Sequence, residues 1–267
     1  MSEYNFDPTD AFEKIKTQFL EWFKNVNCTK VVLGISGGKD STVCAYLLSK
    51  IIGPNNVYGV MMPNGQQKDI SDSMEVCKLT GINSKIIDIS NAYNAMIDQL
   101  KYNGFTPSTD TVINMPPRLR MTALYAVAQT VDGIVLNTDN IDEVISGYYT
   151  IFGDGAGSYG LLRNLTVGEV IGLGKWLGVP EHLIMKTPGD GLQDKGDEDR
   201  LGFKYADLDN YIRKNEGSDE FKEKINARYR ENVFKTNLIN IDGPVFGYPN
   251  YVKKSAIIIA PIEHENS

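Results

Sequence analysis

The chain has 267 residues, of which 42% are hydrophobic and 23% are charged, proportions that are ordinary for a globular protein. This length accommodates one large α/β domain, and the formal net charge of −7 argues against general affinity for nucleic acid or for anionic membranes. Three scattered cysteines and two histidines exclude a Cys/His metal site and are typical of a reducing compartment. Residues 1–10 are polar and acidic, and no run of about eighteen apolar residues follows, so we expect a cytoplasmic protein without membrane contact.

Strands and helices alternate through the first half of the chain. Helices are predicted where apolar residues recur every three or four positions, and strands where short β-branched runs end at glycine, proline or asparagine. The predicted elements are a helix at 10–25, a strand at 30–35, a helix from residue 40 onward, a strand at 57–62, a helix at 69–79, a strand at 84–89 and a helix at 91–100. This alternation indicates βαβ crossovers and therefore an α/β fold, a doubly wound parallel sheet with helices on both faces.

The second half of the chain contains longer irregular stretches. Residues 103–114 are polar and predict a loop, and two glycine-rich stretches, 147–160 and 188–202, predict mobile loops near a site. We expect one domain over residues 1–267, with a tail at 239–267 whose apolar run either docks on the body or pairs with another chain. The remaining predicted elements are a helix that Pro116 and Pro117 open and that runs to about Val131, a strand at 134–137, and helices at 166–178, 205–214 and 218–232.

A glycine-rich stretch joins the first predicted strand to the helix that follows it. Its residues are Gly34, Ile35, Ser36, Gly37, Gly38, Lys39, Asp40 and Ser41. Glycines let a polyanion approach the backbone amides, the serines add hydroxyl donors, and the helix directs its positive end at the same place. The spacing differs from the P-loop and dinucleotide-fold fingerprints. It resembles the pyrophosphate loop of ATP pyrophosphatases, a resemblance in which Asp40 helps to hold Mg²⁺.

A second polar stretch, 137–143, follows the fourth predicted strand and reads Asn-Thr-Asp-Asn-Ile-Asp-Glu. Ligands of open parallel sheets bind at the carboxyl ends of strands, so Thr138 and the acidic residues are expected to face the same crevice as the phosphate loop. An Asp/Asn-rich helix cap explains the same residues, and for Glu143 both interpretations stay open.

Two arginines, Arg118 and Arg120, lie two residues apart at a predicted helix start, so they cannot share one face of the helix. We expect one to point to a ligand or to a partner subunit and the other to form a structural ion pair. The alternative is that both lie in solvent. The acidic stretch Asp197–Asp199 is, on charge alone, typical of a solvated loop.

In this order, these stretches resemble ammonia-dependent NAD synthetase. The resemblance rests on the phosphate loop and on five further stretches, at 118–121, 137–143, 147–155, 165–180 and 197–203, and it covers about residues 12–235. It implies an enzyme that activates the carboxylate of nicotinic acid adenine dinucleotide with ATP and releases pyrophosphate. Ammonia would then displace AMP from the adenylate to give the amide.

The same resemblance implies roles for individual residues and for a partner. Asp40 and Glu143 would hold Mg²⁺, Asp154 would orient ammonia, and Lys186 would take part in catalysis. The implied contacts to ATP or to the dinucleotide come from the phosphate loop and from Gln67, Arg118, Thr138 and Lys235. A homodimer would share the acid-substrate site. The chain departs from the family pattern in the dinucleotide half of the site, at Ile151, Ser158 and Val167.

Two other functions are compatible with the sequence. One is a related ATP-dependent amidating ligase that acts on a different carboxylic acid. The other is a nucleotide-binding protein without turnover, against which the acidic residues argue, because a binding module has no need of paired metal carboxylates.

Overall fold

The computed structural model describes residues 4–67, 70–186, 197–238 and 243–247. The elements, in chain order, are α1 (Pro8–Asn25), β1 (Val31–Gly34), α2 (Lys39–Ile51), the short 3-10 helix η1 (Pro54–Asn56), β2 (Val57–Met61), α3 (Ile70–Thr80), β3 (Asn83–Ile86), α4 (Ser90–Tyr102), α5 (Thr109–Val131), β4 (Ile134–Val135), α6 (Ile141–Ser146), α7 (Val167–Leu177), α8 (Glu181–Ile184), α9 (Asp197–Leu201), α10 (Tyr205–Lys214) and α11 (Asp219–Leu238). No helix within the described ranges has the length and the apolar character that a membrane crossing requires.

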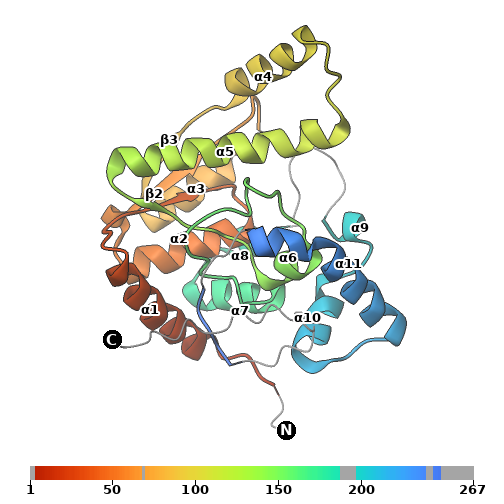
Figure 1. The fold of residues 1–267 in the computed structure, drawn as a ribbon. Coiled ribbons are helices and arrows are strands. Elements are labelled where there is room, and N and C mark those ends of the chain that lie inside the picture. The colour runs from red at the N-terminus through yellow and green to blue at the C-terminus, as the bar shows by residue number, and fades with distance from the viewer. Residues whose placement is uncertain (1–3, 68–69, 187–196, 239–242, 248–267) are drawn as a thin grey trace, which may run out of the picture.

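The sheet holds four parallel strands in the order β3-β2-β1-β4. Figure 1 labels two neighbouring strands, β2 and β3. Val31 on β1 lies opposite Val57 on β2 and Ile134 on β4. The chain moves outward from β1 through β2 to β3, and it then returns to place β4 on the other side of β1. The direction of winding therefore reverses between β1 and β4, which is the point where open sheets of this kind bind ligands.

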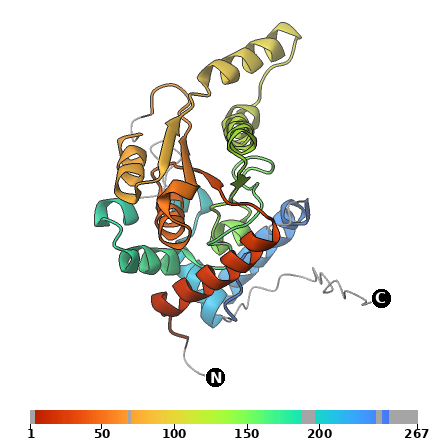
Figure 2. The ribbon, with the colours of Figure 1, turned by 90° about the vertical axis from the view of Figure 1, so that its left-hand side faces the viewer.

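Side chains of β1 alternate between the two faces of the sheet. Val31 and Leu33 are buried in a core built with α1, α2 and α7, whereas Val32 is buried in a second core built with α5. Figure 2 shows α3 on one side of the strands and α5 on the other. The predicted fold class, a doubly wound parallel sheet covered on both faces, is confirmed.

Helix α5 begins earlier than the sequence predicts. Ser108 caps the helix by accepting a hydrogen bond from Thr111 N, and the helix then runs from Thr109 through both prolines to Val131. The prolines predict a helix start because an internal proline removes a backbone donor. Here the Ser108 cap closes a turn ahead of them, so residues 109–114 are helical and that part of the predicted loop is wrong.

Three other boundaries differ from the predicted ones. Strand β4 has two residues, α11 continues to Leu238, and α9 makes part of the predicted loop at 188–202 helical. The rest of that loop, residues 187–196, lies outside the described residues. Around and beyond Val135, the chain that follows β4 pairs with the loop at 158–160.

Residues 243–247 form an anchored segment beside α1. Gln18 Nε2 donates to Val245 O at 2.8 Å, and Val245 N donates back to Gln18 Oε1 at 2.6 Å. Phe246 is 7% exposed and belongs to the main core. This part of the predicted tail therefore docks on the body, whereas the apolar run Ala256–Ala260 lies outside the described residues.

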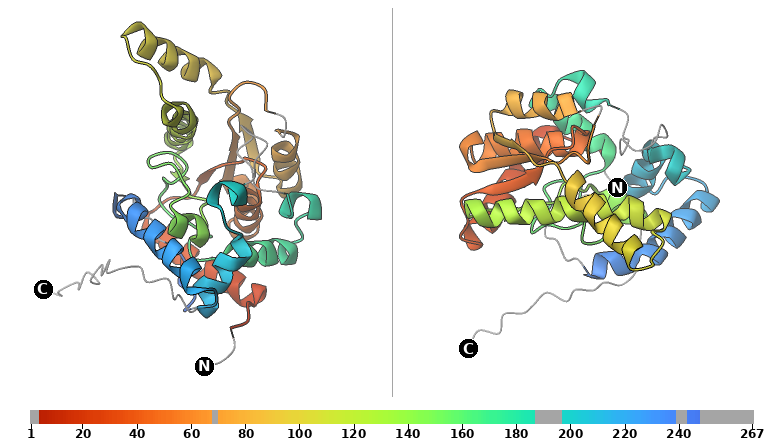
Figure 3. Two further views of the ribbon diagram at one scale, coloured as in Figure 1. Left: turned by 90° about the vertical axis from the view of Figure 1, so that its right-hand side faces the viewer. Right: turned by 90° about the horizontal axis from the view of Figure 1, so that it is seen from above.

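Helices α6, α10 and α11 pack around a separate apolar cluster beside the sheet (Figure 3). A buried ion pair ties this part of the chain to α7: Arg213 Nε lies 2.6 Å from Glu169 Oε1, and Arg213 Nη2 lies 2.9 Å from Glu169 Oε2. The Tyr4 hydroxyl also donates to Glu169. These contacts fix α10 against α7, and Val167 N at the start of α7 donates to Asp142 Oδ2 on α6, the helix that carries Glu143.

Candidate active site

The phosphate loop turns sharply at Gly37. Its φ of +78° lies in the left-handed region, and a Cβ atom there would lie 3.1 Å from both the amide nitrogen and the hydroxyl of Ser73. Ser36 Oγ accepts a hydrogen bond from Gly38 N at 3.2 Å and lies 3.0 Å from Ser41 Oγ. Gly38 then precedes the first turn of α2. The loop therefore presents amides and hydroxyls at the positive end of a helix, a chemistry that suits phosphate.

The ends of the loop are held by the sheet and by α2. Gly34 is the last residue of β1, and Ile35 donates its N–H to Val60 O at 2.9 Å. At the other end Lys39 is 5% exposed, and its Nζ lies 2.9 Å from Asp40 Oδ2. A buried lysine and a carboxylate thus meet where the loop becomes helix.

A hydrogen bond joins the phosphate loop to the second polar stretch. Asn140 Nδ2 donates to Asp40 Oδ1 at 3.0 Å. The fully buried Asn140 also forms a capping box: its Oδ1 accepts from the N–H groups of Asp142 and Glu143, and its own N–H donates to Glu143 Oε2 at 2.9 Å. Stretch 137–143 thus provides a helix cap and also lies beside the phosphate loop, because the same asparagine caps α6 and binds Asp40.

Carboxylates crowd the space beside this bond. Burial raises the pKa of Glu143 well above its ordinary value, and the charges of Asp40 and Asp139 raise it further. Burial and then the charge of Asp154 raise the pKa of Asp139 to about 7, against the opposing effect of Arg163, whose Nη1 lies 3.3 Å from Asp139 Oδ2. Because these carboxylates disfavour one another's charge, a cation among them would be stabilised.

This set of donors suits a magnesium ion that arrives with a phosphate substrate. Within the described residues, no group of three or more Asp, Glu, His or Cys side chains forms a ready metal cage. Mg²⁺ is usually bound by one or two carboxylates together with substrate phosphates and water. Asp40 and Glu143 supply two carboxylates beside the phosphate loop and match that pattern.

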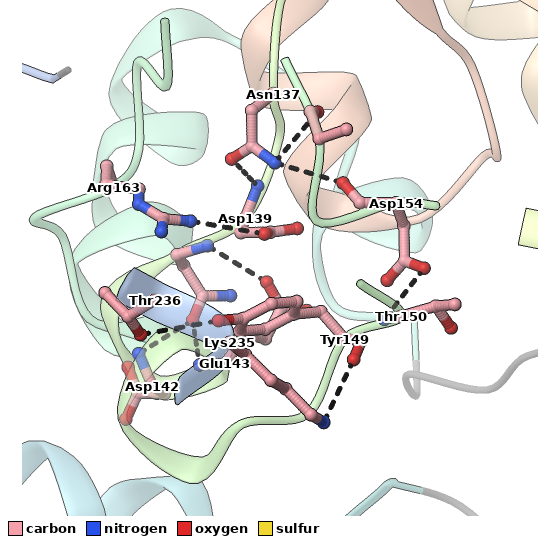
Figure 4. A network of polar contacts seen from close by, with 12 residues as sticks. Asn137, Asp139, Asp142, Glu143, Tyr149, Thr150, Asp154, Arg163, Lys235 and Thr236 are labelled. Carbon is pink, nitrogen blue, oxygen red and sulfur yellow. Dashed lines mark hydrogen bonds and ion pairs between the residues drawn. The ribbon is translucent and has the colours of Figure 1, made fainter. Parts of the chain in front are cut away.

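Asp154 lies on a turn that follows α6 (Figure 4). Its Oδ1 accepts a hydrogen bond from Thr150 N at 3.1 Å, and Gly153 N and Gly155 N both donate to Thr150 O. The Thr150 hydroxyl lies 2.9 Å from Asn114 Oδ1 on α5. The turn therefore holds Asp154 in a fixed place between α5 and α6, where burial of the carboxylate raises its pKa.

Arg118 and Arg120 point to different neighbours. Arg118 is exposed, and its Nε donates to Ile151 O at 3.2 Å, beside the turn that carries Asp154. Arg120 is more buried, and its Nε donates to Met62 O at 3.0 Å. Of the two arginines, Arg118 is the more exposed, while the charge of Arg120 also acts on the turn by opposing the rise in the pKa of Asp154.

Three other predicted site residues come from separate elements. Thr138 lies three residues after β4, and Gln67 lies three residues before α3; both are half-buried. Lys186 Nζ lies 2.6 Å from Asp72 Oδ2 on α3, and a Cβ atom at Gly37 would lie 3.1 Å from Asp72 Cβ. Lys186 therefore sits one side chain away from the phosphate loop.

Lys235 has its ammonium group directed at the end of α6. Its Nζ donates to Gly147 O at 2.8 Å and to Tyr149 O at 3.3 Å (Figure 4). Burial lowers the pKa of Lys235, and the charge of Arg228 adds to this effect. Arg228 also holds this end of α6, since its Nε donates to Ser146 O at 2.7 Å. Lys235 is predicted to contact a nucleotide. In this structure its ammonium group instead binds two main-chain carbonyls.

Two buried polar residues of the site, Asn137 and Arg163, have no predicted role in the sequence analysis. Asn137 is 1% exposed and Arg163 is 8% exposed. A signal exists for Asn137, because an amide at the carboxyl end of a buried strand faces the ligand side of a parallel sheet. The sequence offers none for Arg163, whose partner Asp139 is 24 residues away.

Comparison with known proteins decides the family to which this arrangement belongs. A sequence model of the family described as NAD synthase matches residues 11–240. The chain belongs to the NAD synthase family. The chain is 39% identical to the NH(3)-dependent NAD(+) synthetase of Thermococcus kodakarensis over 203 residues, which cover 76% of this chain and 79% of that protein.

Solved structures agree with the family of this NAD synthase. The structure of NMN synthetase from Francisella tularensis is similar with a TM-score of 0.80 and 34% identity, covering 86% of this chain and 96% of that chain. The NH3-dependent NAD synthetase from Campylobacter jejuni is similar with a TM-score of 0.71 and 27% identity, over 86% and 96% of the two chains. The predicted family and the predicted enzyme class, a carbon–nitrogen ligase, are confirmed, whereas the roles of individual residues stay predictions.

Proposed function

We propose that this NAD synthase joins ammonia to the carboxylate of nicotinic acid adenine dinucleotide through an adenylate, giving NAD, AMP and pyrophosphate. The observation that carries the proposal is the hydrogen bond between Asn140 and Asp40. It brings a phosphate-binding loop and a group of carboxylates together where the winding of the sheet reverses. A polyanion site beside carboxylates suits a reaction in which ATP is split with the help of a divalent cation.

The phosphate end of the site supports the departure of pyrophosphate. In this proposal the amides of Gly37 and Gly38 and the hydroxyls of the loop serines receive the phosphates, and Lys39 adds a positive charge. Asp40 and Glu143 would hold Mg²⁺, which supplies the charge that neutralises the leaving pyrophosphate. Gln67, Thr138 and Lys186 complete the proposed contacts to ATP.

The other end of the site supports amide formation. The Asp154 carboxylate, fixed through Thr150 N, would orient ammonia toward the adenylate, and Arg118 would contact the acid substrate beside Ile151. Lys235 is bound to carbonyls at the end of α6. We therefore infer that Lys235 supports the site by holding the helix that carries Glu143.

A second candidate differs in the acid substrate. The TM-score of 0.80 with the Francisella NMN synthetase exceeds the 0.71 with the Campylobacter NAD synthetase. The departures at Ile151, Ser158 and Val167 lie in the dinucleotide half, where the buried Val167 side chain offers no charge to a second nucleotide. These observations support the mononucleotide acid as an alternative substrate, with NMN as the product.

Pyrophosphate release from ATP and ammonium distinguishes these functions. The purified protein is assayed with nicotinic acid adenine dinucleotide, with nicotinic acid mononucleotide and with a panel of other carboxylic acids. Faster release with the dinucleotide, with NAD as product, supports the first proposal, and faster release with the mononucleotide supports the second. Release with another acid alone would identify a related amidating ligase. Nucleotide binding without release with any acid would contradict every enzymatic proposal.

We also propose a homodimer whose interface contributes to the acid-substrate site. In the α4–α5 hairpin, α4 projects from the body whereas α5 packs on the sheet (Figures 1 and 3), and within α4, all of which is described, no residue is buried. Exposed apolar side chains line this hairpin, namely Tyr102, Phe105, Val112, Ile113 and Tyr125. Helix α7 is also rich in apolar residues, but it packs against α1, α2 and α10 of its own chain, so the core explains them.

Sedimentation over a wide concentration range tests this dimer. The shared site is tested by mixing two inactive variants that are altered on opposite sides of the proposed interface. A monomer at every concentration would contradict the dimer, and stable variants that exchange subunits without recovering activity would contradict the shared site.

The proposed location of the protein is the cytoplasm. Its three cysteines, Cys28, Cys44 and Cys77, carry free thiols. Cytoplasm keeps thiols reduced, so these residues fit that compartment. Fractionation of cells that express the protein tests the assignment.

A further inference from the structure

We propose that Asn137 is a positioning residue for amide formation, because it fixes the turn that presents the Asp154 carboxylate. This inference rests on the proposed function, in which Asp154 orients ammonia. Asn137 itself touches no reacting atom in this proposal and acts through the backbone of residues 154–156.

The Asn137 side chain connects two parts of the site (Figure 4). Its Nδ2 donates to Asp154 O at 3.0 Å and to Ala156 O at 3.4 Å, and its Oδ1 accepts from Asp139 N at 3.0 Å. The backbone N–H of Asn137 donates to Tyr159 O at 2.9 Å. One residue just after β4 therefore holds the main chain at Asp154 and at the residues that follow it.

The position of the Asp154 turn depends on its hydrogen bonds to Asn137 and within the turn itself. The Asp154 side chain is held at one oxygen by Thr150 N, while its main chain is held by Asn137. Gly157 has a φ of +145°, and a Cβ atom there would lie 2.6 Å from Asn137 N. The glycine lets the turn approach β4 closely enough for the amide of Asn137 to reach two carbonyls.

An amide side chain suits this position chemically. Asn137 is 1% exposed, and its two functional ends face a main-chain N–H on one side and two carbonyls on the other. Aspartate would keep the acceptor for Asp139 N but would direct a carboxylate oxygen at the carbonyls of Asp154 and Ala156. Alanine would remove both contacts. Either change should release the turn without touching the phosphate loop.

The chain supplies a matched control on the opposite edge of the sheet. Asn83 Nδ2 donates to Asn55 O at 2.9 Å and to Val57 O at 3.4 Å, nearly the same pair of contacts. Asn83 is exposed and lies on β3, away from the carboxylates. If loss of an asparagine that binds two carbonyls had a general effect on the enzyme, Asn83→Ala would produce it as well.

Steady-state kinetics with ammonium and ATP varied separately test the proposal. In Asn137→Ala and Asn137→Asp we expect the KM for ammonium to rise by about 10- to 100-fold, because a displacement of about 1 Å in a reacting group can cost this much. The KM for ATP and the exchange of pyrophosphate into ATP should stay within about twofold, since the phosphate loop is unchanged. Asn83→Ala should change neither constant.

Gly157→Ala disturbs the contact between the turn and Asn137 by adding a methyl group to the turn. It should likewise raise the KM for ammonium and leave the KM for ATP nearly unchanged. If Asn137→Ala proves too unstable to assay, Asn137→Asp and Gly157→Ala still decide the matter. Equal rises in both KM values, or an unchanged KM for ammonium in folded Asn137→Asp and Gly157→Ala, would overturn the positioning role. Absence of acid-dependent pyrophosphate release in the unaltered protein would instead overturn the proposed function and this inference with it.

Discussion

The two edges of the sheet are built in different ways. At the β4 edge, a loop covers the strand: Ser158 N donates to Val135 O at 2.9 Å, and Asn137 pairs with Gly160. At the β3 edge, all residues of Asn83–Ile86 are exposed. Charged side chains are buried beside the covered edge, and burial of charge costs free energy. The difference teaches that this fold places a group of costly buried charges where the winding reverses and the proposed chemistry occurs.

Asn137 at the β4 edge and Asn83 at the β3 edge show the same difference for single residues. Asn137 and Asn83 each bind two main-chain carbonyls at closely similar distances. They differ in burial and in what the bound segments carry, because the first holds the turn of Asp154 and the second holds a short connection before β2. Contact geometry alone therefore does not separate a functional asparagine from a structural one.

The largest difference between the edges should appear when carboxylates are removed. Asp40→Asn and Glu143→Gln should lower acid-dependent pyrophosphate release by about 10³-fold or more, because a bound metal supplies several kcal/mol of charge stabilisation. Asp88→Asn is the control at the β3 edge, where the Asp88 carboxylate accepts from Ser90 N at 2.7 Å. Its release rate should stay within about twofold. Unchanged turnover in either of the first two variants would remove that carboxylate from the metal site.

Stability should fall with rising pH on account of Asp139. Its pKa of about 7 in the folded chain exceeds that of an ordinary aspartate, so from about pH 4 to pH 7 the folded state keeps a proton that the unfolded state has lost. The contribution of Asp139 is therefore most favourable below about pH 4, and up to about 4 kcal/mol is lost by the time the pH passes 7. Urea unfolding at several pH values should show a smaller decline in Asp139→Asn. The decline should persist in Asp88→Asn, and parallel curves for the parent and Asp139→Asn would contradict the assignment.

Removal of the buried Arg163 should lower the free energy of unfolding by slightly less than the pH effect of Asp139. Arg163→Met leaves Asp139 without its ion-pair partner, so at pH 8 the free energy of unfolding should drop by about 3 kcal/mol. The drop should shrink at pH 5, where Asp139 is protonated. Lys85→Met removes an exposed cation on β3 and should change stability by no more than about 0.5 kcal/mol. If Arg163→Met and Lys85→Met lost the same free energy of unfolding at pH 8, the two edges would not differ in how much their cations stabilise the fold.

The smallest effect is expected on the exposed strand. Ile86 is 52% exposed, so Ile86→Lys should alter the free energy of unfolding by about 0.5 kcal/mol or less. It should also leave the sedimentation coefficient unchanged, because the proposed dimer uses the α4–α5 hairpin. A change in association state would show that the β3 edge is itself an interface.

The sequence predicts the parts of the site that depend on local pattern. The phosphate loop follows β1 as expected, because a short apolar run, two glycines and a periodic helix lie in immediate succession. The acidic stretch likewise follows β4, and the Asn140 cap was foreseeable from residue type alone. The start of α5 was not, since the cap at Ser108 competes with a stronger proline signal further on.

Contacts between distant residues could not be predicted in the same way. Asp40 and Asn140 are 100 residues apart, and Asp139 and Arg163 are 24 apart, so no spacing rule links either pair. Lys235 illustrates the same limit: the resemblance implies a nucleotide contact, whereas its ammonium group binds the carbonyls of Gly147 and Tyr149 in this arrangement. Only the packing of α11 against α6 determines that outcome.

The anchored segment at 243–247 sets a practical limit on how this protein can be shortened. Phe246 fills the main core, and Lys14 Nζ donates to its carbonyl at 3.2 Å. A version that ends after Gly247 keeps Phe246 in the core, and an affinity tag attached there would not disturb this packing. A version trimmed at residue 242 loses the phenylalanine and exposes the apolar side of α1 to water, which makes it the poorer choice for expression and crystallisation.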